Sequence, residues 1–361
     1  MSSSRSTSST KTTGNPAIKS DNHSLRVNKA PEYQSRIRCK YCKGLYITKR
    51  GLRYKKYETV QLYYCKSCRK TFTDSKRKHK TYPLEIIFEG LGSYYRGQNY
   101  AQATRDLNST YDIDIDPKSL RDWIKKTKSY CLYAPYRKKA MSRFPAPEAV
   151  REVPLRSDNR SVFCFHQAKL KLLLERYRFL PFSRLNKWLD HLHTLLKDNR
   201  YPHGFYNIHQ HVILPDNLRL KQQSVNMAIF LARLIEEEVS RKTRRKELLP
   251  KLMLAIDSAT IATNVPVLLI PSNINHLAKH LPPETLPELP LSPVIIGAID
   301  LIQVRSGKIH LLHYKAYPTK QDPTTQLNLH AQLISQASGL PLNKFKCAWF
   351  NAGGYWEFWP T

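Results

Sequence analysis

The chain has 361 residues and a formal net charge of +31, with 59 Lys and Arg against 28 Asp and Glu. This length allows two or three domains. The absence of an apolar run of membrane-spanning length, and of a signal peptide's apolar core, argues against membrane and secreted classes. Seven cysteines, an odd number, suit a reducing compartment better than a disulfide scaffold. We therefore expect an intracellular protein, cytoplasmic and nucleoid-associated, that spans no membrane.

The positive charge is concentrated toward the N-terminus. Residues 1–143 carry 32 Lys and Arg against 11 Asp and Glu, whereas residues 250–361 carry 8 against 6. A basic segment of this density attracts polyanions and is typical of nucleic-acid binding. A charged surface that merely keeps the chain soluble is the alternative. The charge pattern favours DNA as the partner, and a homo-oligomer is compatible with it.

Two Cys-x-x-Cys pairs give the most specific signal of the chain. Residues 1–30 read as a disordered basic tail, and a small module follows at 33–76 with expected strands at 45–47, 59–64 and 71–73. Two residues between thiolates let one turn present both sulfurs to a single ion, and four thiolates favour structural zinc with no open coordination position. Reduced cysteines or two disulfides are the alternatives. The predicted ligands are Cys39, Cys42, Cys65 and Cys68.

Helical periodicity begins after this zinc ribbon. Residues 77–130 predict a helix at 84–95, a short helix at 101–107, and a third helix capped by Asp116. The pattern suits a helix-turn-helix whose last helix enters a major groove, although any three-helix bundle also fits it. The predicted DNA contacts are Ser119, Arg121, Lys125 and Lys126 on the third helix, with Lys76, Arg77, Lys78 and Lys80 on phosphates.

The remaining chain divides into three parts. Residues 131–160 contain several prolines among charges and predict a linker, and residues 161–249 predict a helical region. Residues 250–361 favour an α/β domain. The expected fold class is therefore multidomain α+β. The strands expected in the last domain are 252–256, 265–270, 294–304, 308–315 and 345–350, with a helix at 325–338.

Polar residues at strand ends suggest chemistry in this last domain. Asp300 lies on one expected strand, a turn follows at Ser306 and Gly307, and Lys315 ends the next strand. An acid, a hairpin and an acid-x-Lys pattern are typical of metal-dependent nucleases, in which carboxylates hold Mg²⁺ and the lysine orients water or stabilises negative charge.

Over residues 252–361 the pattern resembles the PD-(D/E)XK nuclease superfamily, in its RecB-like branch. The resemblance implies that Asp300 is the first acid and a ligand of Mg²⁺ or Mn²⁺, that Lys315 is the catalytic lysine, and that Gln326 is the glutamine of the following helix. The chain departs from the family pattern at three positions: His313 replaces the second acid, His330 replaces a tyrosine, and Asn264 stands in place of a further glutamate often found on the preceding strand.

These departures weaken the expected metal site. Imidazole binds Mn²⁺ or Zn²⁺ but is a poor Mg²⁺ ligand, and it removes a negative charge that would help to hold the ion. His313 is therefore a candidate catalytic residue of an altered site. Both an active endonuclease and a nuclease fold that has lost catalysis stay open.

The N-terminal half resembles the front of insertion-sequence transposases, where a zinc ribbon precedes a helix-turn-helix. This resemblance offers an RNase H-like domain as an alternative, with Asp257, Asp300 and Glu357 as its acids, but Glu357 lies too near the C-terminus for a helix to carry it. We expect a DNA-binding protein with a nuclease-like domain, in a mobile element or genome defence. The alternatives are a non-enzymatic regulator, a transposase-derived protein and an RNA-binding zinc-ribbon protein.

Overall fold

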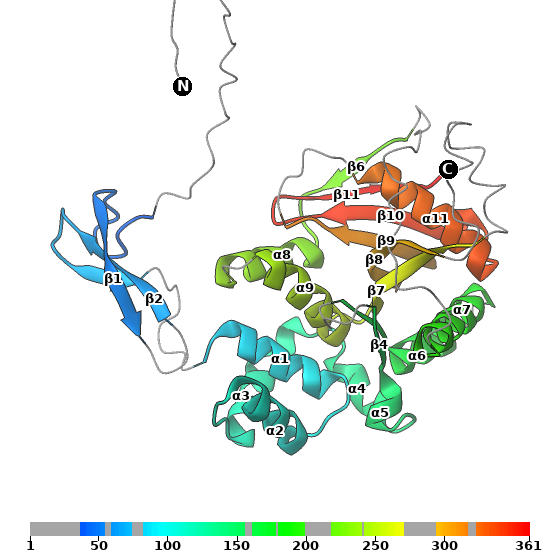
Figure 1. Ribbon diagram of the computed structural model, residues 1–361, viewed down its shortest axis with the longest axis horizontal. Coiled ribbons are helices and arrows are strands. Elements are labelled where there is room, and N and C mark those ends of the chain that lie inside the picture. Colours follow the sequence, from blue (N-terminus) through cyan, green and yellow to red (C-terminus); the bar gives the residue numbers. More distant parts are fainter. Residues whose placement is uncertain are drawn as a thin grey trace, which may run out of the picture. The chain divides into compact units, whose positions relative to one another are not determined.

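The computed structural model describes residues 37–54, 59–73, 82–155, 161–177, 180–198, 218–239, 242–270, 294–316 and 323–361 (Figure 1). It is a mixed α and β structure with two separate sheets, which agrees with the expected α+β class. The chain forms two compact units, one ending at Lys76 and the other extending from Arg77 to Thr361. The expected basic tail at 1–30 lies outside the described residues.

The first unit is a three-stranded antiparallel sheet in the order β1-β2-β3. Tyr63 and Phe72 are stacked with ring centroids 5.8 Å apart, and they form the small core with two buried cysteines. The first strand starts at Ile47 rather than Leu45 and runs through Gly51, whose φ of +88° accompanies a register shift that a glycine tolerates best. The strands are β1 (Ile47–Tyr54), β2 (Thr59–Cys65) and β3 (Thr71–Thr73).

Three helices open the second unit: α1 (Leu84–Tyr95), α2 (Tyr100–Tyr111) and α3 (Pro117–Thr127). Asn99 and Gln102 form a capping box at the start of α2, and the Asp116 side chain accepts a hydrogen bond from the Lys118 N–H at the start of α3. The helices approach closely at Gly90, where a Cβ atom would lie 2.9 Å from Leu107 Cδ1. The expected three helices and the Asp116 cap are therefore present.

The stretch expected as a linker, 131–160, instead contributes regular structure to the second unit. It contains α4 (Ala134–Met141), α5 (Ala146–Ala149) and β4 (Arg151–Pro154), after the short helix η1 (Lys128–Tyr130). Pro135 lies in the first turn of α4, where its missing N–H costs no hydrogen bond. The proline that suggested a linker therefore marks a helix start.

An eight-stranded sheet in the order β4-β5-β7-β8-β9-β10-β11-β6 dominates the second unit. All neighbouring strands are antiparallel except β9 and β10, which are parallel and joined by the crossover helix α11 (Thr324–Ser338). The further strands are β5 (Val162–Phe165), β6 (Lys221–Gln223), β7 (Thr260–Leu269), β8 (Val294–Arg305), β9 (Lys308–Tyr314), β10 (Phe345–Phe350) and β11 (Tyr355–Phe358).

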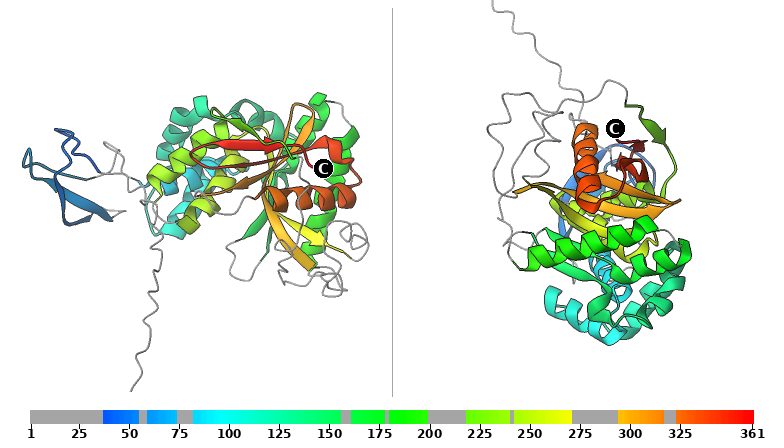
Figure 2. Two further views of the ribbon diagram at one scale, coloured as in Figure 1. Left: turned by 90° about the horizontal axis from the view of Figure 1, so that it is seen from above. Right: turned by 90° about the vertical axis from the view of Figure 1, so that its right-hand side faces the viewer.

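Helices cover both faces of this sheet (Figure 2). Leu312 and Phe350 share one apolar cluster with α8 (Met227–Glu238) and α9 (Lys242–Ile256). Leu311 and Phe345 share the other cluster with α11 and α7 (Leu180–Lys197), and α6 (Gln167–Tyr177) contributes to this cluster through Leu170. Residues 161–249 are thus mainly helical, as expected, but they also supply β5 and β6 to the sheet.

The expected strand at Leu252–Ile256 is the last part of α9. All five of its side chains are buried, so the run is apolar on every side and its periodicity cannot distinguish a helix from a strand. This assignment from the sequence is therefore wrong, and the next strand of the sheet, β7, begins only after Asp257.

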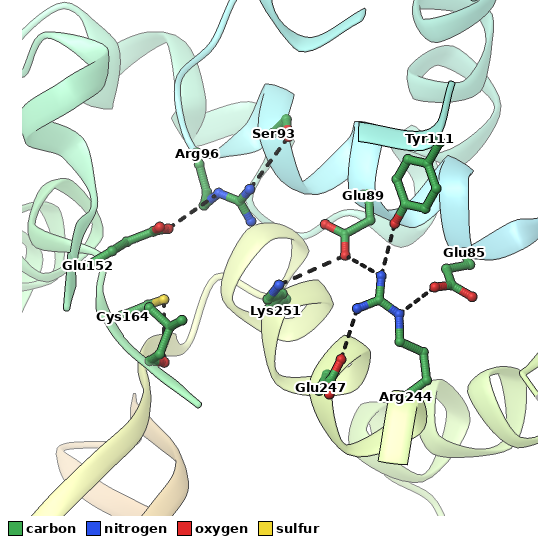
Figure 3. Close-up of polar contacts among 11 residues, drawn as sticks. Glu85, Glu89, Ser93, Arg96, Tyr111, Glu152, Cys164, Arg244, Glu247 and Lys251 are labelled. Atoms are coloured by element: carbon green, nitrogen blue, oxygen red, sulfur yellow. Dashed lines mark hydrogen bonds and ion pairs between the residues drawn. The ribbon is translucent and has the colours of Figure 1, made fainter. Parts of the chain in front are cut away.

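An arginine on α9 joins the three-helix group to the rest of the second unit (Figure 3). The Arg244 guanidinium is ion-paired with Glu85 and Glu89 of α1 and donates a 2.9 Å hydrogen bond to Tyr111 Oη of α2. Glu247 supplies a third carboxylate at 2.9 Å. Because these carboxylates surround it, the pKa of Arg244 is raised despite its burial. The boundaries expected near 130 and 249 do not separate compact units in the structure.

Candidate metal centre and nuclease-like site

The four cysteines of the two Cys-x-x-Cys pairs converge in the first unit. Their sulfur atoms all lie within 4.8 Å of one another, with 3.5 Å between the Sγ atoms of Cys39 and Cys68 and 3.6 Å between those of Cys42 and Cys65. A tetrahedral ion with metal–sulfur bonds of about 2.3 Å would separate its ligands by about 3.8 Å. The sulfurs therefore fit zinc, and none of the chain's seven cysteines is in a disulfide.

Two similar turns place these thiolates. The Cys39 N–H donates to the Gly44 carbonyl over 2.9 Å, and the Cys65 N–H donates to the Lys70 carbonyl over 3.0 Å. Lys43 and Arg69 occupy matching positions, each with a positive φ, near 60°. The sequence pattern therefore produces two copies of one ligand-bearing turn, and four sulfur ligands give a structural rather than a catalytic centre.

The described part of this zinc module is strongly basic. Residues 37–54 and 59–73 contain nine Lys and Arg and no Asp or Glu. None of these nine side chains forms an ion pair within the described residues. Tyr46 and Tyr54 are also largely exposed, at 75% and 78%. The module thus presents unneutralised positive charge with aromatic rings among it.

On the large sheet, Asp300 and His313 form a cross-strand pair. Leu301 of β8 pairs with Leu312 of β9, which places the two polar residues opposite each other. Asp300 Oδ2 lies 3.2 Å from His313 Nδ1 and accepts a 2.7 Å hydrogen bond from the Tyr314 N–H. Lys315 follows directly, its own N–H bonded to the Phe350 carbonyl at 2.9 Å. The structure therefore brings three of the expected catalytic residues together.

The charges of this group influence one another. Burial raises the pKa of Asp300, but His313, the Tyr314 N–H and Lys315 outweigh it, so the pKa lies below its usual value. Burial lowers the pKa of Lys315; Asp300 opposes this shift, and Lys246 of α9 adds to it. The carboxylate is thus held ionised at neutral pH, beside an imidazole and an amine.

The crossover helix completes this neighbourhood. His330 of α11 lies with its ring centroid 5.8 Å from that of His313, and Gln326 lies in the first part of the same helix, half-buried. His313 Nε2 is buried and has no hydrogen-bond partner among the described residues. The position expected to carry a second carboxylate is occupied by the His313 imidazole instead.

Asn264 has a local structural partner. The pairs of β7 with β8 on either side place it opposite Asp300, with a φ of +50°. Its side-chain amide donates a 3.0 Å hydrogen bond to the Val162 carbonyl of β5. This bond accounts for the polar side chain without a role toward the Asp300 carboxylate.

The described residues do not fit a preformed Mg²⁺ site. Apart from the four cysteines, no group of three or more His, Cys, Asp or Glu in the described part of the chain brings its ligand atoms together. Mg²⁺ requires oxygen ligands, and Asp300 is the one carboxylate of the cluster described above. The catalytic Mg²⁺ or Mn²⁺ expected from the resemblance has no further support in the structure.

The acids of the RNase H-like alternative have separate partners. The Asp257 carboxylate accepts hydrogen bonds from the N–H groups of Ala259 and Thr260, from Thr260 Oγ1 at 2.6 Å, and from Gln303 Nε2 at 2.8 Å. Glu357 on β11 pairs with Lys346 Nζ at 2.7 Å. Both carboxylates are buried and bonded to neighbouring groups of the fold, so the contacts of Asp257 and Glu357 do not indicate a three-acid centre.

A buried lysine next to Asp257 gave no signal in the sequence. Lys169 of α6 donates its ammonium to the carbonyls of Leu254, Asp257 and Thr260, where α9 turns into β7. Burial lowers the pKa of Lys169 to about 7, although Asp257 opposes this shift. Its partners lie 85 to 91 residues away in sequence, so only the folded structure brings them together.

A second feature that sequence reasoning missed is an aromatic pair beside the Asp300 cluster. Trp349 of β10 stands in register with His313, and its ring stacks on Trp356 of β11 at 4.0 Å. Side chains alternate along β10, so residues 345, 347 and 349 lie on one face. This alternation in the sequence would have placed Trp349 on the same face as the buried Phe345.

The structure describes the expected DNA contacts on α3 but not the expected phosphate contacts that precede α1. Arg121, Lys125 and Lys126 are exposed and Ser119 is half-buried. The Arg121 guanidinium lies over the Tyr100 ring, 5.3 Å from its centroid. Lys76, Arg77, Lys78 and Lys80 lie outside the described residues. The exposed face of α3 therefore has cations, as the sequence predicts, while its docking into a groove stays a prediction.

Comparison of the chain with protein-family models, curated proteins and solved structures finds no match. Within the ranges that the structure describes, no helix is both long and apolar enough to cross a membrane.

Proposed function

We propose that the chain is a DNA-binding protein in which a zinc module and α3 contact the nucleic acid. The observation that carries this proposal is that the Lys and Arg side chains of the zinc module and of α3 form no ion pairs with described acidic residues. The described residues of the zinc module, 37–54 and 59–73, carry nine Lys and Arg and no acid, and Arg121, Lys125 and Lys126 of α3 form no ion pair with described residues. Lys and Arg that are not already neutralised displace counterions from DNA phosphates, which drives binding.

The Asp300 cluster supports a second, narrower proposal about the C-terminal part. It retains the strand, hairpin and Lys positions of a nuclease-like site, with His313 against Asp300 in place of a second carboxylate. We infer a nuclease-like scaffold that holds DNA but does not cut it with Mg²⁺. Mobile-element or defence roles rest on the two resemblances alone.

Replacement of both Arg121 and Lys125 by Gln is expected to weaken binding to a short duplex by about tenfold, because each phosphate contact contributes to affinity. The dependence of log Kd on log salt concentration should fall by about two. Fluorescence anisotropy with labelled duplexes at several salt concentrations measures both quantities.

The matched control is Lys187→Gln with Lys197→Gln, two exposed cations of α7 that give the same change in net charge. Equal losses for the two double variants would mean that total charge, not α3, drives binding. Binding of a duplex RNA is measured in parallel. This comparison distinguishes recognition of a DNA groove by α3 from recognition of RNA. RNA bound more tightly than DNA would contradict the proposal.

The wild-type chain is expected to leave DNA intact in Mg²⁺, and His313→Asp is expected to cleave it at least roughly tenfold above that background. Aspartate adds the oxygen ligands and negative charge that Mg²⁺ requires beside Asp300. Gel analysis of single- and double-stranded DNA, in Mg²⁺ and separately in Mn²⁺, measures cleavage. His313→Asp with Lys315→Ala is the control and should be inactive. Wild-type cleavage that Lys315→Ala abolishes would show instead an active enzyme with a histidine in its site.

A further inference from the structure

A cavity of about 330 Å³ lies within the second unit, among α1, α2, α3, η1 and α4. It combines three tyrosines with five cationic side chains. The cationic residues are Arg121, Lys125, Lys128, Arg137 and Lys138. None of the charged residues that line it is acidic, so its electrostatic potential is strongly positive.

The five cations have no carboxylate partners among the described residues. The adjacent residue of α4, Lys139, makes the contrast clear, because its Nζ lies 3.8 Å from Glu175. Five like charges around one cavity repel one another, which is unfavourable for the free protein. A bound anion would remove this repulsion.

Aromatic rings hold the two arginines in place. Tyr94 and Tyr100 are stacked with centroids 4.8 Å apart, Arg121 lies over Tyr100, and Arg137 lies 3.8 Å from the centroid of Tyr94. Arg137 also donates to the carbonyls of Tyr94 and Gln98, at 2.8 and 2.9 Å, where α1 ends. The guanidinium planes are thus fixed before a ligand arrives, which lowers the entropic cost of binding.

We propose that this pocket binds a phosphoryl group that carries two negative charges, and that its main source is the terminal phosphate of a DNA end. A phosphate monoester carries about two charges at neutral pH, whereas a diester within a strand carries one. Arginine forks and lysine ammonium groups are the side chains that bind such oxygens best. The choice of DNA as the source rests on the proposed function.

A free nucleotide is the other source of the same chemistry. The cavity volume lies at the small end of the range for small-molecule sites, about 300 to 1,000 Å³, so a nucleoside triphosphate enters at most in part. The stacked tyrosines also offer a surface for a terminal base. ATP and pyrophosphate therefore serve as separate arms of the test.

The test compares short blunt duplexes that differ only in a 5′ phosphate or a 5′ hydroxyl, with the full-length chain. We expect the wild type to bind the phosphorylated duplex about tenfold more tightly. Lys128→Gln with Lys138→Gln should abolish this preference while the hydroxyl duplex still binds. Both lysines are exposed, so the fold should be kept, and circular dichroism checks it. Lys139→Gln, the ion-paired neighbour, is the control and should retain the preference.

The other outcomes are equally decisive. Binding of pyrophosphate or ATP that Lys128→Gln with Lys138→Gln removes, without preference for a DNA end, would support the phosphoryl pocket and assign it to free nucleotides. If no DNA bound while pyrophosphate did, the proposed function would fail and the pocket would stand. Equal affinity for both duplexes together with no binding of pyrophosphate or ATP would overturn the inference.

Discussion

Removal of zinc is expected to unfold residues 37–73 and to leave the second unit folded. The buried side chains of the zinc module are those of two cysteine ligands, Tyr63 and Phe72. This core is too small to fold without a further constraint. Structural zinc contributes about 10 to 16 kcal/mol in small zinc modules. Cys65→Ser should therefore abolish the fold of the module, as measured by metal content, limited proteolysis and amide NMR dispersion.

A cysteine outside the cluster provides the control. Cys164 of β5 is also buried but does not belong to the cluster of four cysteines, so Cys164→Ser should keep one zinc per chain. Because the two units have separate cores, melting of the second unit should be the same in wild type and Cys65→Ser. A metal-free module with intact NMR dispersion would contradict a structural zinc centre.

Replacement of Asp257 by Ala is expected to destabilise the second unit by about 3 to 5 kcal/mol, the range seen when a buried charged network loses one partner. The change would leave the N–H groups of Ala259 and Thr260 and the side chain of Gln303 without their acceptor. It also removes a carboxylate charge that stabilises the buried Lys169 ammonium. Chemical denaturation followed by circular dichroism measures the free energy of unfolding.

Two variants define how this result is interpreted. Asp257→Asn keeps an acceptor oxygen and should lose less stability than Asp257→Ala. Asp114→Ala, at an exposed carboxylate, should change stability by less than about 0.5 kcal/mol. A stable Asp257→Ala chain with lowered DNA activity would instead favour the catalytic role that the RNase H-like alternative gives to this residue.

Features set by short spacing could be predicted from the sequence. The Cys-x-x-Cys pairs indicated their own cluster, and Asp116 before Pro117 indicated the start of α3, because each depends on residues within one turn. The pairing of Asp300 with His313 follows similarly from the tight turn at Ser306 and Gly307, which fixes the register of β8 and β9.

Features set by distant parts of the chain could not be predicted. Strand β6 has three residues and pairs with β11 more than 130 positions later, and no local pattern shows such a partner. The three carbonyls around Lys169 lie 85 to 91 positions from it in the sequence. The sequence of Leu252–Ile256 predicts a strand rather than a helix, because a helix buried on all sides loses its amphipathic period.

The strand order has a consequence for the timing of folding. Strands β4 and β5 pair with each other at one end of the sheet and β6 lies at the other, yet β5 and β6 are synthesised before β7 and β11, the strands that join them to the rest of the sheet. Until β7 and β11 emerge from the ribosome, the β4–β5 pair and β6 cannot join the rest of the sheet, and pairings of such long sequence separation form slowly. Strand β11 therefore decides when this edge of the sheet can close, and a translation product interrupted before β11 would carry exposed strands prone to aggregation.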